Sequence, residues 1–130
     1  MTDIAVTTNT IAARGTKKVV TASPATSSVA NAAEVFVFTP TRGADQCVVL
    51  ASVANSHGSV TYSIAAGDFW AGDDAGTGSF AQNTMNALII DTAQYLQSDG
   101  TIVITCTPAE NKRMATDHVF TFYLIELSKA

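Results

Sequence analysis

The densest group of chemically capable side chains lies in residues 54–74, ANSHGSVTYSIAAGDFWAGDD. This stretch holds a histidine, His57, and the adjacent aspartates Asp73-Asp74. It also holds Tyr62 and the single tryptophan of the chain, Trp70. Such residues can bind a metal ion, transfer protons or stack on a sugar ring. Each of these chemistries requires partners at defined spacings, so the neighbours of these residues decide between them.

The spacings do not fit a metal or catalytic site. His57 and the second histidine, His118, have no carboxylate or cysteine at a ligand spacing. A calcium loop places its acids at alternate positions, whereas Asp73-Asp74 are adjacent. The run GTGS at 76–79 lacks the lysine of a phosphate loop and the G-x-S-x-G order of a nucleophile elbow. The sequence therefore predicts a non-enzymatic protein with no cofactor and no metal site.

The aromatic residues of the same stretch leave two interpretations open. Phe69 and Trp70, together with Tyr62, could form a platform for a sugar, as in a carbohydrate-binding module. Tryptophan is also enriched in contacts between proteins. On that second interpretation, Phe69 and Trp70 are partner-binding residues that cover one end of the domain or a subunit contact.

Length and charge limit the classes of protein that fit. A chain of 130 residues corresponds to one domain. Charged residues make up only 14%, against about 25% in ordinary soluble domains, so part of the exterior is expected to contact protein. The net charge of −4 argues against nucleic acid as a partner. The acidic start predicts synthesis in the cytoplasm without a signal peptide, and no apolar run is long enough for a membrane span.

Hydrophobic alternation with a period of two predicts an all-β fold. The expected strands are 34–39, 46–54, 59–65, 84–91, 101–108 and 118–127, with turn residues every 8 to 12 positions. Counting the less regular segments gives seven or eight strands and no amphipathic helix. This pattern is typical of an antiparallel β-sandwich or barrel.

The segments between these strands carry turn signals. Residues 55–58, Asn-Ser-His-Gly, predict a hairpin loop, and the glycine-rich residues 68–80 predict a long loop. Residues 108–117 are polar and fit either a helix or a loop. Cys47 and Cys106 fall on apolar strand positions, so both are expected to be buried free thiols.

The first 32 residues differ from the rest of the chain. They contain no aromatic residue and are rich in Thr, Ala and Ser, so they bury little apolar surface by themselves. Residues 1–30 have three cations against one acid, a charge of +2, whereas residues 31–130 have four cations against ten acids, a charge of −6. We therefore predict an extended N-terminal arm, 1–32, and a β-sandwich body, 33–130. The predicted partner-binding residues of the arm are Ile4, Val6, Arg14, Lys17, Lys18 and Val19.

Three segments of the body resemble small structural proteins of tailed bacteriophages, in particular head decoration, or cement, proteins. The segments are VANSHGSVTYSIAAGDFWA, AQNTMNALIIDTAQYLQSDGTIVITCTPA and DHVFTFYLIEL, and the resemblance covers about residues 33–127. It implies a virion structural protein that sits on the capsid surface. The implied partners are the major capsid protein and neighbouring copies of the chain, and both monomers and trimers stay open. A tail-tube, connector or fibre protein is the alternative within virions.

Overall fold

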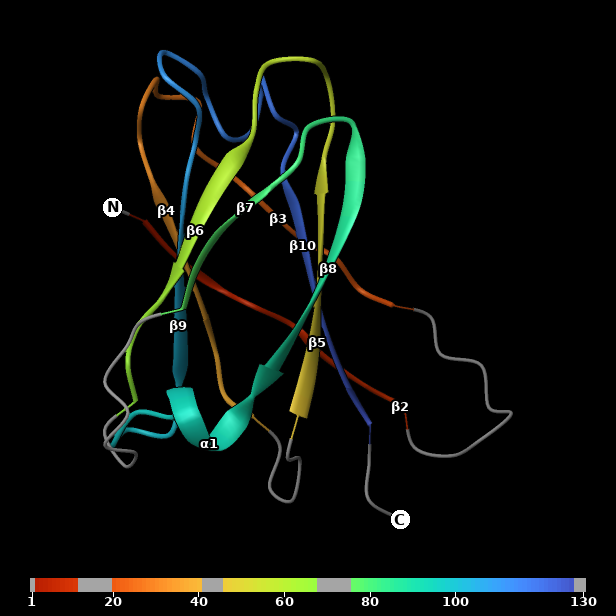
Figure 1. The fold of residues 1–130 in the computed structure, drawn as a ribbon, viewed down its shortest axis with the longest axis vertical. Helices are drawn as coiled ribbons and strands as arrows, with labels where there is room; N and C mark the ends of the chain where they lie inside the picture. Colours follow the sequence, from red (N-terminus) through yellow and green to blue (C-terminus); the bar gives the residue numbers. More distant parts are fainter. Residues whose placement is uncertain (1, 12–19, 41–45, 68–75, 128–130) are drawn as a thin grey trace.

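The computed structural model describes residues 2–11, 20–40, 46–67 and 76–127 (Figure 1). These residues form a sandwich of two mixed β-sheets, which confirms the all-β prediction and selects the sandwich over the closed barrel. The first sheet has the strand order β1-β4-β9-β6-β7, and the second has the order β2-β10-β5-β8, with β3 also paired to β10. The elements are β1 (Thr2–Ala5), β2 (Thr8–Ile11), β3 (Ser23–Pro24), β4 (Glu34–Phe38), β5 (Gln46–Val53), β6 (Val60–Ile64), β7 (Gly76–Phe80), β8 (Thr84–Asp91), the single helical turn α1 (Thr92–Tyr95), β9 (Ile102–Thr107) and β10 (Thr121–Leu127).

The core lies between the two sheets, and the predicted alternation supplies it. Strand β5 buries Cys47, Val49, Ala51 and Val53, and the inward positions of β9 and β10 are buried in the same way. Phenylalanines from both sheets meet in the centre. Phe36 of β4 stacks on Phe122 of β10 with ring centroids 4.8 Å apart, and Phe120 and Phe80 extend this cluster. Each such aromatic pair contributes roughly 0.5–1.5 kcal/mol beyond the burial of its surface.

The loop at 55–58 is not a hairpin, which corrects the prediction from its turn residues. Asn55 and Gly58 do adopt positive φ angles, 68° and 104°. However, the strand before the loop, β5, belongs to the second sheet, and the strand after it, β6, belongs to the first. The loop therefore passes from one sheet to the other. Residues that tolerate positive φ serve a hairpin and a crossing between sheets equally well.

Part of the predicted glycine-rich loop is a strand. Residues 76–80 form β7, which pairs with β6 along its whole length, while residues 68–75 lie outside the described part of the chain. The ring of Tyr62 stacks on Phe80 at 4.6 Å and passes over Gly78. A Cβ atom at Gly78 would stand 2.6 Å from the Tyr62 hydroxyl, so only glycine leaves room for that ring.

The remaining connections are short. Residues 108–117 form turns rather than a helix, and Gly100 takes a positive φ of 86° in the predicted turn before β9. Strand β8 ends in α1, which is the only helical element among the described residues. None of the helical structure in the described ranges is long and apolar enough to cross a bilayer.

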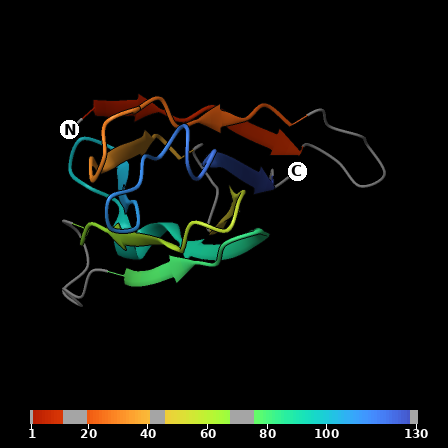
Figure 2. The same cartoon turned by 90° about the horizontal axis from the view of Figure 1, so that it is seen from above.

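The N-terminal segment is paired with the body. Strand β1 runs parallel to β4, and β2 runs parallel to the last strand, β10, so both sheets are mixed rather than purely antiparallel. Between them, Val6 crosses from one sheet to the other, is buried, and donates its N–H to Val37 O at 2.9 Å. Viewed from above, this red chain runs along one edge of both sheets (Figure 2). Val6 and Ala25 belong to the core, a larger contribution than the composition of residues 1–32 had suggested.

Candidate interaction surface

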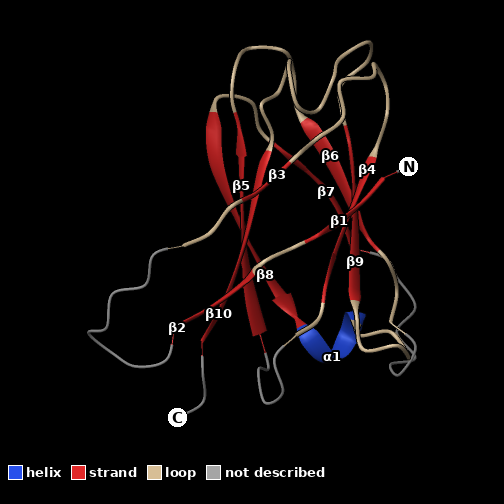
Figure 3. Ribbon diagram, turned by 180° about the vertical axis from the view of Figure 1, so that it is seen from behind, coloured by secondary structure: helices blue, strands red, loops and turns tan. Residues whose placement is uncertain are grey.

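The two faces of the second sheet differ in what covers them. The inner face packs against the first sheet, whereas no described element covers the outer face (Figures 1 and 3). We call this outer surface the apolar face. Its residues are Val48, Leu50 and Ser52 on β5, Met85, Ala87 and Ile89 on β8, and Thr121, Tyr123 and Ile125 on β10.

The strand register makes the apolar face continuous. On the central strand, Val48 stands opposite Ile89 on one side and Ile125 on the other. The next outward residue, Leu50, stands opposite Ala87 and Tyr123 in the same way. Directly opposed side chains in a sheet have Cβ atoms about 4.5–5.5 Å apart, so these rows are in contact. None of the nine residues carries a charge.

Exposure on the apolar face is highest along its margin. Met85 is 56% exposed and Ile89 is 66% exposed, and both lie on the edge strand β8. Three strands about 4.8 Å apart and about seven residues long cover roughly 300 Å². Apolar patches of this size on a monomer are often functional. The cores of protein interfaces are likewise poor in charge and enriched in Tyr and Met.

The outer face of the first sheet has a different composition. Its outward positions on β6, β7 and β9 are mostly hydroxyl residues: Thr61, Ser63, Thr77, Ser79 and Thr105. These side chains hydrogen-bond to water and need no covering layer. The outward positions of β4 and of the middle of β9 are apolar instead, namely Val35, Val37 and Val103. Hydroxyl residues therefore cover the β6–β7 side of this face, whereas the second sheet is apolar across three adjacent strands.

The structure describes only some of the predicted partner-binding residues, which lie in the arm and at 69–70. Ile4 is half-buried and packs against the core of its own chain, and Val6 is buried, so both already contact the body. The other predicted residues lie outside the described part of the chain: Arg14, Lys17, Lys18, Val19, Phe69 and Trp70. Tyr62, the remaining member of the proposed sugar platform, is half-buried and stacked on Phe80.

One buried amide fixes the middle of the N-terminal segment. Asn9, only 1% exposed, donates from Nδ2 to the carbonyl oxygens of Leu124 and Thr21, both at 3.0 Å. Its Oδ1 accepts the N–H of Thr21 at 2.7 Å. The side chain thus ties β2, β10 and the chain before β3 together. Nothing in the sequence near Asn9 indicated this, because Leu124 is 115 positions away.

A buried carboxylate holds the end of the same segment. Glu34, the first residue of β4, is 0% exposed. Its carboxylate accepts the N–H groups of Thr26, at 3.0 Å, and of Ser27. Charge-assisted bonds to backbone N–H groups are among the stronger hydrogen bonds in proteins. Glu34 therefore fixes residues 26–27 against the body.

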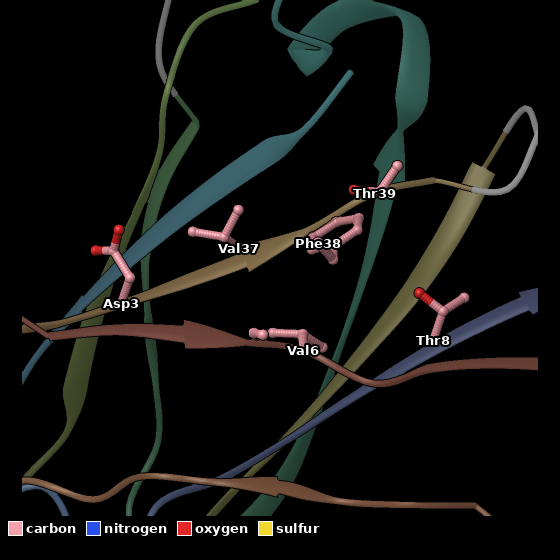
Figure 4. A pocket seen from close by; sticks show the side chains of 7 residues that line it. Asp3, Val6, Thr8, Val37, Phe38 and Thr39 are labelled. Atoms are coloured by element: carbon pink, nitrogen blue, oxygen red, sulfur yellow. The ribbon is translucent and has the colours of Figure 1, made fainter. Parts of the chain in front are cut away.

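A groove lies where the N-terminal segment crosses between the sheets (Figure 4). Its volume is about 440 Å³, and it lies between the β1–β2 segment and the end of β4. Its lining consists of Asp3, Ala5, Val6, Thr8, Val37, Phe38 and Thr39. With a single carboxylate and two threonines, it lacks the several convergent polar groups that position a small ligand.

The two histidines have different environments. His57 is exposed in the crossing loop, whereas His118 is buried and precedes β10 rather than opening it, as the sequence had suggested. His118 Nε2 accepts the N–H of Ala109 at 3.1 Å. Burial lowers the pKa of His118, and the nearby Asp117 opposes this shift. Across the described ranges, no three His, Cys, Asp or Glu residues are grouped to hold a metal ion.

Both cysteines are buried free thiols, as predicted. They lie on different sheets, Cys47 on β5 and Cys106 on β9. Burial raises the pKa of the Cys106 thiol, and the carboxylate of Glu34 adds to the shift. Burial also raises the pKa of Cys47, and the hydrogen bond between its thiol and the hydroxyl of Thr92 opposes this shift. These thiols are packing residues rather than nucleophiles.

Comparisons with protein-family models, with curated proteins and with solved structures find no match. The apolar face is therefore the feature on which a function can be argued. The predictions from sequence did not include this face, although the sequence carries one signal of it. The strands at 46–53, 84–91 and 121–127 have apolar residues at both odd and even positions, which indicates burial on both faces.

Proposed function

We propose that this chain is a non-enzymatic structural protein of a phage virion, a head decoration protein that binds the assembled capsid lattice. The apolar face carries the proposal. It is a continuous sheet surface, formed by β5, β8 and β10, whose one described charge is Asp91 at the end of β8, and no described element lies over it. A surface of this kind gains free energy when a protein partner removes it from water, at about 25 cal/mol per Å² of apolar area.

The apolar face is small, which favours a partner that offers many identical binding sites over a single partner molecule in solution. Stable complexes bury about 800 Å² on each partner, and the roughly 300 Å² of this face falls well below that. One such contact is weak, because association also costs translational and rotational freedom. On a capsid, the same contact recurs over a fixed lattice, and linked copies bind with an avidity far above that of one contact.

The resemblance noted in the sequence supports the same class of protein. The quoted segments correspond to the crossing loop with β6, to the region from β8 to β9, and to β10. Two of the three strands that form the apolar face, β8 and β10, thus lie within the segments that resemble head decoration proteins. The implied partner is the major capsid protein, and the implied location is the outer surface of the head.

The decisive experiment compares two lysine substitutions at central strands. Val48→Lys places a charge in the middle of the apolar face, and Val103→Lys places one at an equivalent, half-buried outward position on β9 of the other sheet. Each purified variant is mixed with heads of the encoding phage and sedimented. We expect Val48→Lys to reduce head binding at least about 10-fold, because a buried unpaired charge costs more than 1.4 kcal/mol, and Val103→Lys to bind like the wild type.

Two results would overturn the proposal. If the wild-type chain does not bind heads, it is not a decoration protein, and electron microscopy of labelled particles then tests the tail-tube, connector and fibre alternatives. If Val48→Lys and Val103→Lys bind heads equally well, the apolar face is not the attachment surface. Circular dichroism of both variants checks that each remains folded.

A further inference from the structure

Strand β8 is the outermost strand of the second sheet, and no described segment pairs with its outer edge. It is eight residues long and pairs with β5 in unbroken register from Thr84 opposite Val53 to Asp91 opposite Gln46. An unpaired edge of this length exposes a row of backbone N–H and C=O groups that can pair with another strand.

The edge of β8 lacks the features that normally prevent such pairing. Natural edge strands are short, or contain lysine, proline or a bulge. The sequence TMNALIID has no lysine and no proline, and its one charge, Asp91, stands at the end. The other outer strands are shorter. Strands β1 and β2 have four residues each, and β7 has five, of which two are glycine.

We propose that the outer edge of β8 pairs with β8 of a second copy of this chain, antiparallel about a two-fold axis. The two second sheets, of five strands each, then form one continuous sheet of ten strands. The proposal does not depend on a capsid, since it concerns the purified chain. A second copy is the occupant that the edge itself favours, because a two-fold axis lets one neutral strand complement itself.

The alternation of β8 restricts the register of this pair. The side chains of Met85, Ala87 and Ile89 point to the apolar face, and Ile90 points to the core. Opposed residues in an antiparallel pair lie on the same face, so the two-fold axis must pass through a residue and not between two residues. When the axis passes through a residue, the outward N–H groups of each strand also face the outward C=O groups of the other.

Two central registers pair seven residues of each strand. They differ in the side chains that they place opposite each other. With the axis at Ala87, Met85 stands opposite Ile89 of the second copy, and this apolar contact occurs twice. With the axis at Leu88, Met85 stands opposite the carboxylate of Asp91 instead. The first register buries the two most exposed apolar side chains of the strand, 56% and 66% exposed, against each other. We therefore assign the axis to Ala87.

The proposed pairing is also compatible with the negative net charge of the chain. Two copies with a net charge of −4 each repel one another, so self-association is easiest where no charges meet. In the assigned register, no charged residues are opposed along the edge. The pair also joins two apolar faces into one surface of twice the area.

Charge variants test the register. Met85→Lys with Ile89→Lys opposes two lysine pairs across the axis, whereas Met85→Lys with Ile89→Glu opposes each lysine to a glutamate. Both positions are exposed, so the variants should fold. We expect sedimentation velocity to show a wild-type dimer that forms with rising concentration up to about 1 mM. The Lys/Lys variant should associate at least about 10-fold more weakly, and the Lys/Glu variant within about 3-fold of the wild type.

A cross-link provides the second measurement. In Ala87→Cys, the two introduced thiols lie opposite each other at the axis, where opposed Cβ atoms are about 4.5–5.5 Å apart. A disulfide needs about 3.5–4.5 Å, so a small approach of the two strands allows mild oxidation to give a disulfide-linked dimer. Ser79→Cys, at an exposed position on the edge strand of the first sheet, is the control and should stay monomeric. The native thiols are buried and should not react.

Several outcomes would overturn the inference. If the wild-type chain remains monomeric throughout the concentration range, the proposed dimer does not form. A dimer that the Lys/Lys variant leaves unchanged lies on another surface. Equal cross-linking of Ala87→Cys and Ser79→Cys shows random collision rather than a two-fold pair. Failure of head binding alone leaves the dimer unaffected, so these results are separate from those that test the proposed function.

Discussion

The buried amide of Asn9 allows the attachment of the N-terminal segment to be tested quantitatively. The substitution is Asn9→Ala, and the loss can be worked out from four hydrogen bonds. The carbonyl of Leu124 is buried and loses its amide partner, which costs about 1–3 kcal/mol. The other three bonds go to the backbones of Thr21 and Thr7, both exposed residues, where water can replace the amide at a cost below about 1 kcal/mol in total. We expect the free energy of unfolding to fall by about 1–4 kcal/mol.

Urea denaturation followed by circular dichroism measures this loss, and Asn9→Asp is the matched control. Aspartate keeps an acceptor for the N–H of Thr21 but directs an oxygen at the carbonyls of Leu124 and Thr21. It should therefore destabilise the protein more than alanine does. A loss below about 0.5 kcal/mol for Asn9→Ala, or an Asn9→Asp variant as stable as the wild type, would show that the amide does not hold the segment.

Three further changes have defined outcomes. Cys47 and Cys106 should resist alkylation in the native protein, because both are buried and burial raises the pKa of both thiols. After denaturation without reductant, a thiol assay should count two free thiols per chain, and a count of zero would contradict the prediction. The pKa of His118 is lowered in the folded protein, so folding favours the neutral imidazole. The stability that this gives is fully present above the pKa of the unfolded chain, about 6.5, and is lost as the pH falls below that value. The urea midpoint of the wild type should fall relative to that of His118→Gln between about pH 7 and 5, and parallel curves would contradict the assignment. Gly78→Ala should lower the free energy of unfolding by about 1–3 kcal/mol, since its methyl group collides with the tyrosine ring above it, and an unchanged midpoint would refute that contact.

The strands of the body were predictable because burial on one face imposes a period of two. Residues 84–91 form a strand with the predicted bounds, and the inward positions of 46–53 are those that the alternation indicated. The turn at Gly100 followed from local chemistry in the same way. Where a structure depends on residues close in sequence, the sequence was sufficient.

The errors arose where the structure depends on distant residues. The loop at 55–58 has the turn chemistry of a hairpin, but the pairing of β5 with β10 and of β6 with β9 separates its two strands. Residues 76–80 form a strand by pairing with β6, and the glycine at 78 that suggested a loop instead leaves room for the ring of Tyr62. The apolar face could not be derived from alternation alone, since it requires the neighbour order β10-β5-β8, which no local pattern specifies.

The pairing of β2 with β10 has a consequence for how the chain is made. Strand β2 leaves the ribosome well before its partner strand β10 is synthesised, since Asn9 bonds to Leu124 across 115 positions. At about 5–20 residues per second, the segment waits roughly 6–20 s for that strand. During this time it is exposed without its partner, and an apolar or aromatic sequence would invite aggregation. The threonines and serines of residues 1–32, and their lack of aromatic residues, keep the waiting segment soluble until the sandwich can receive it.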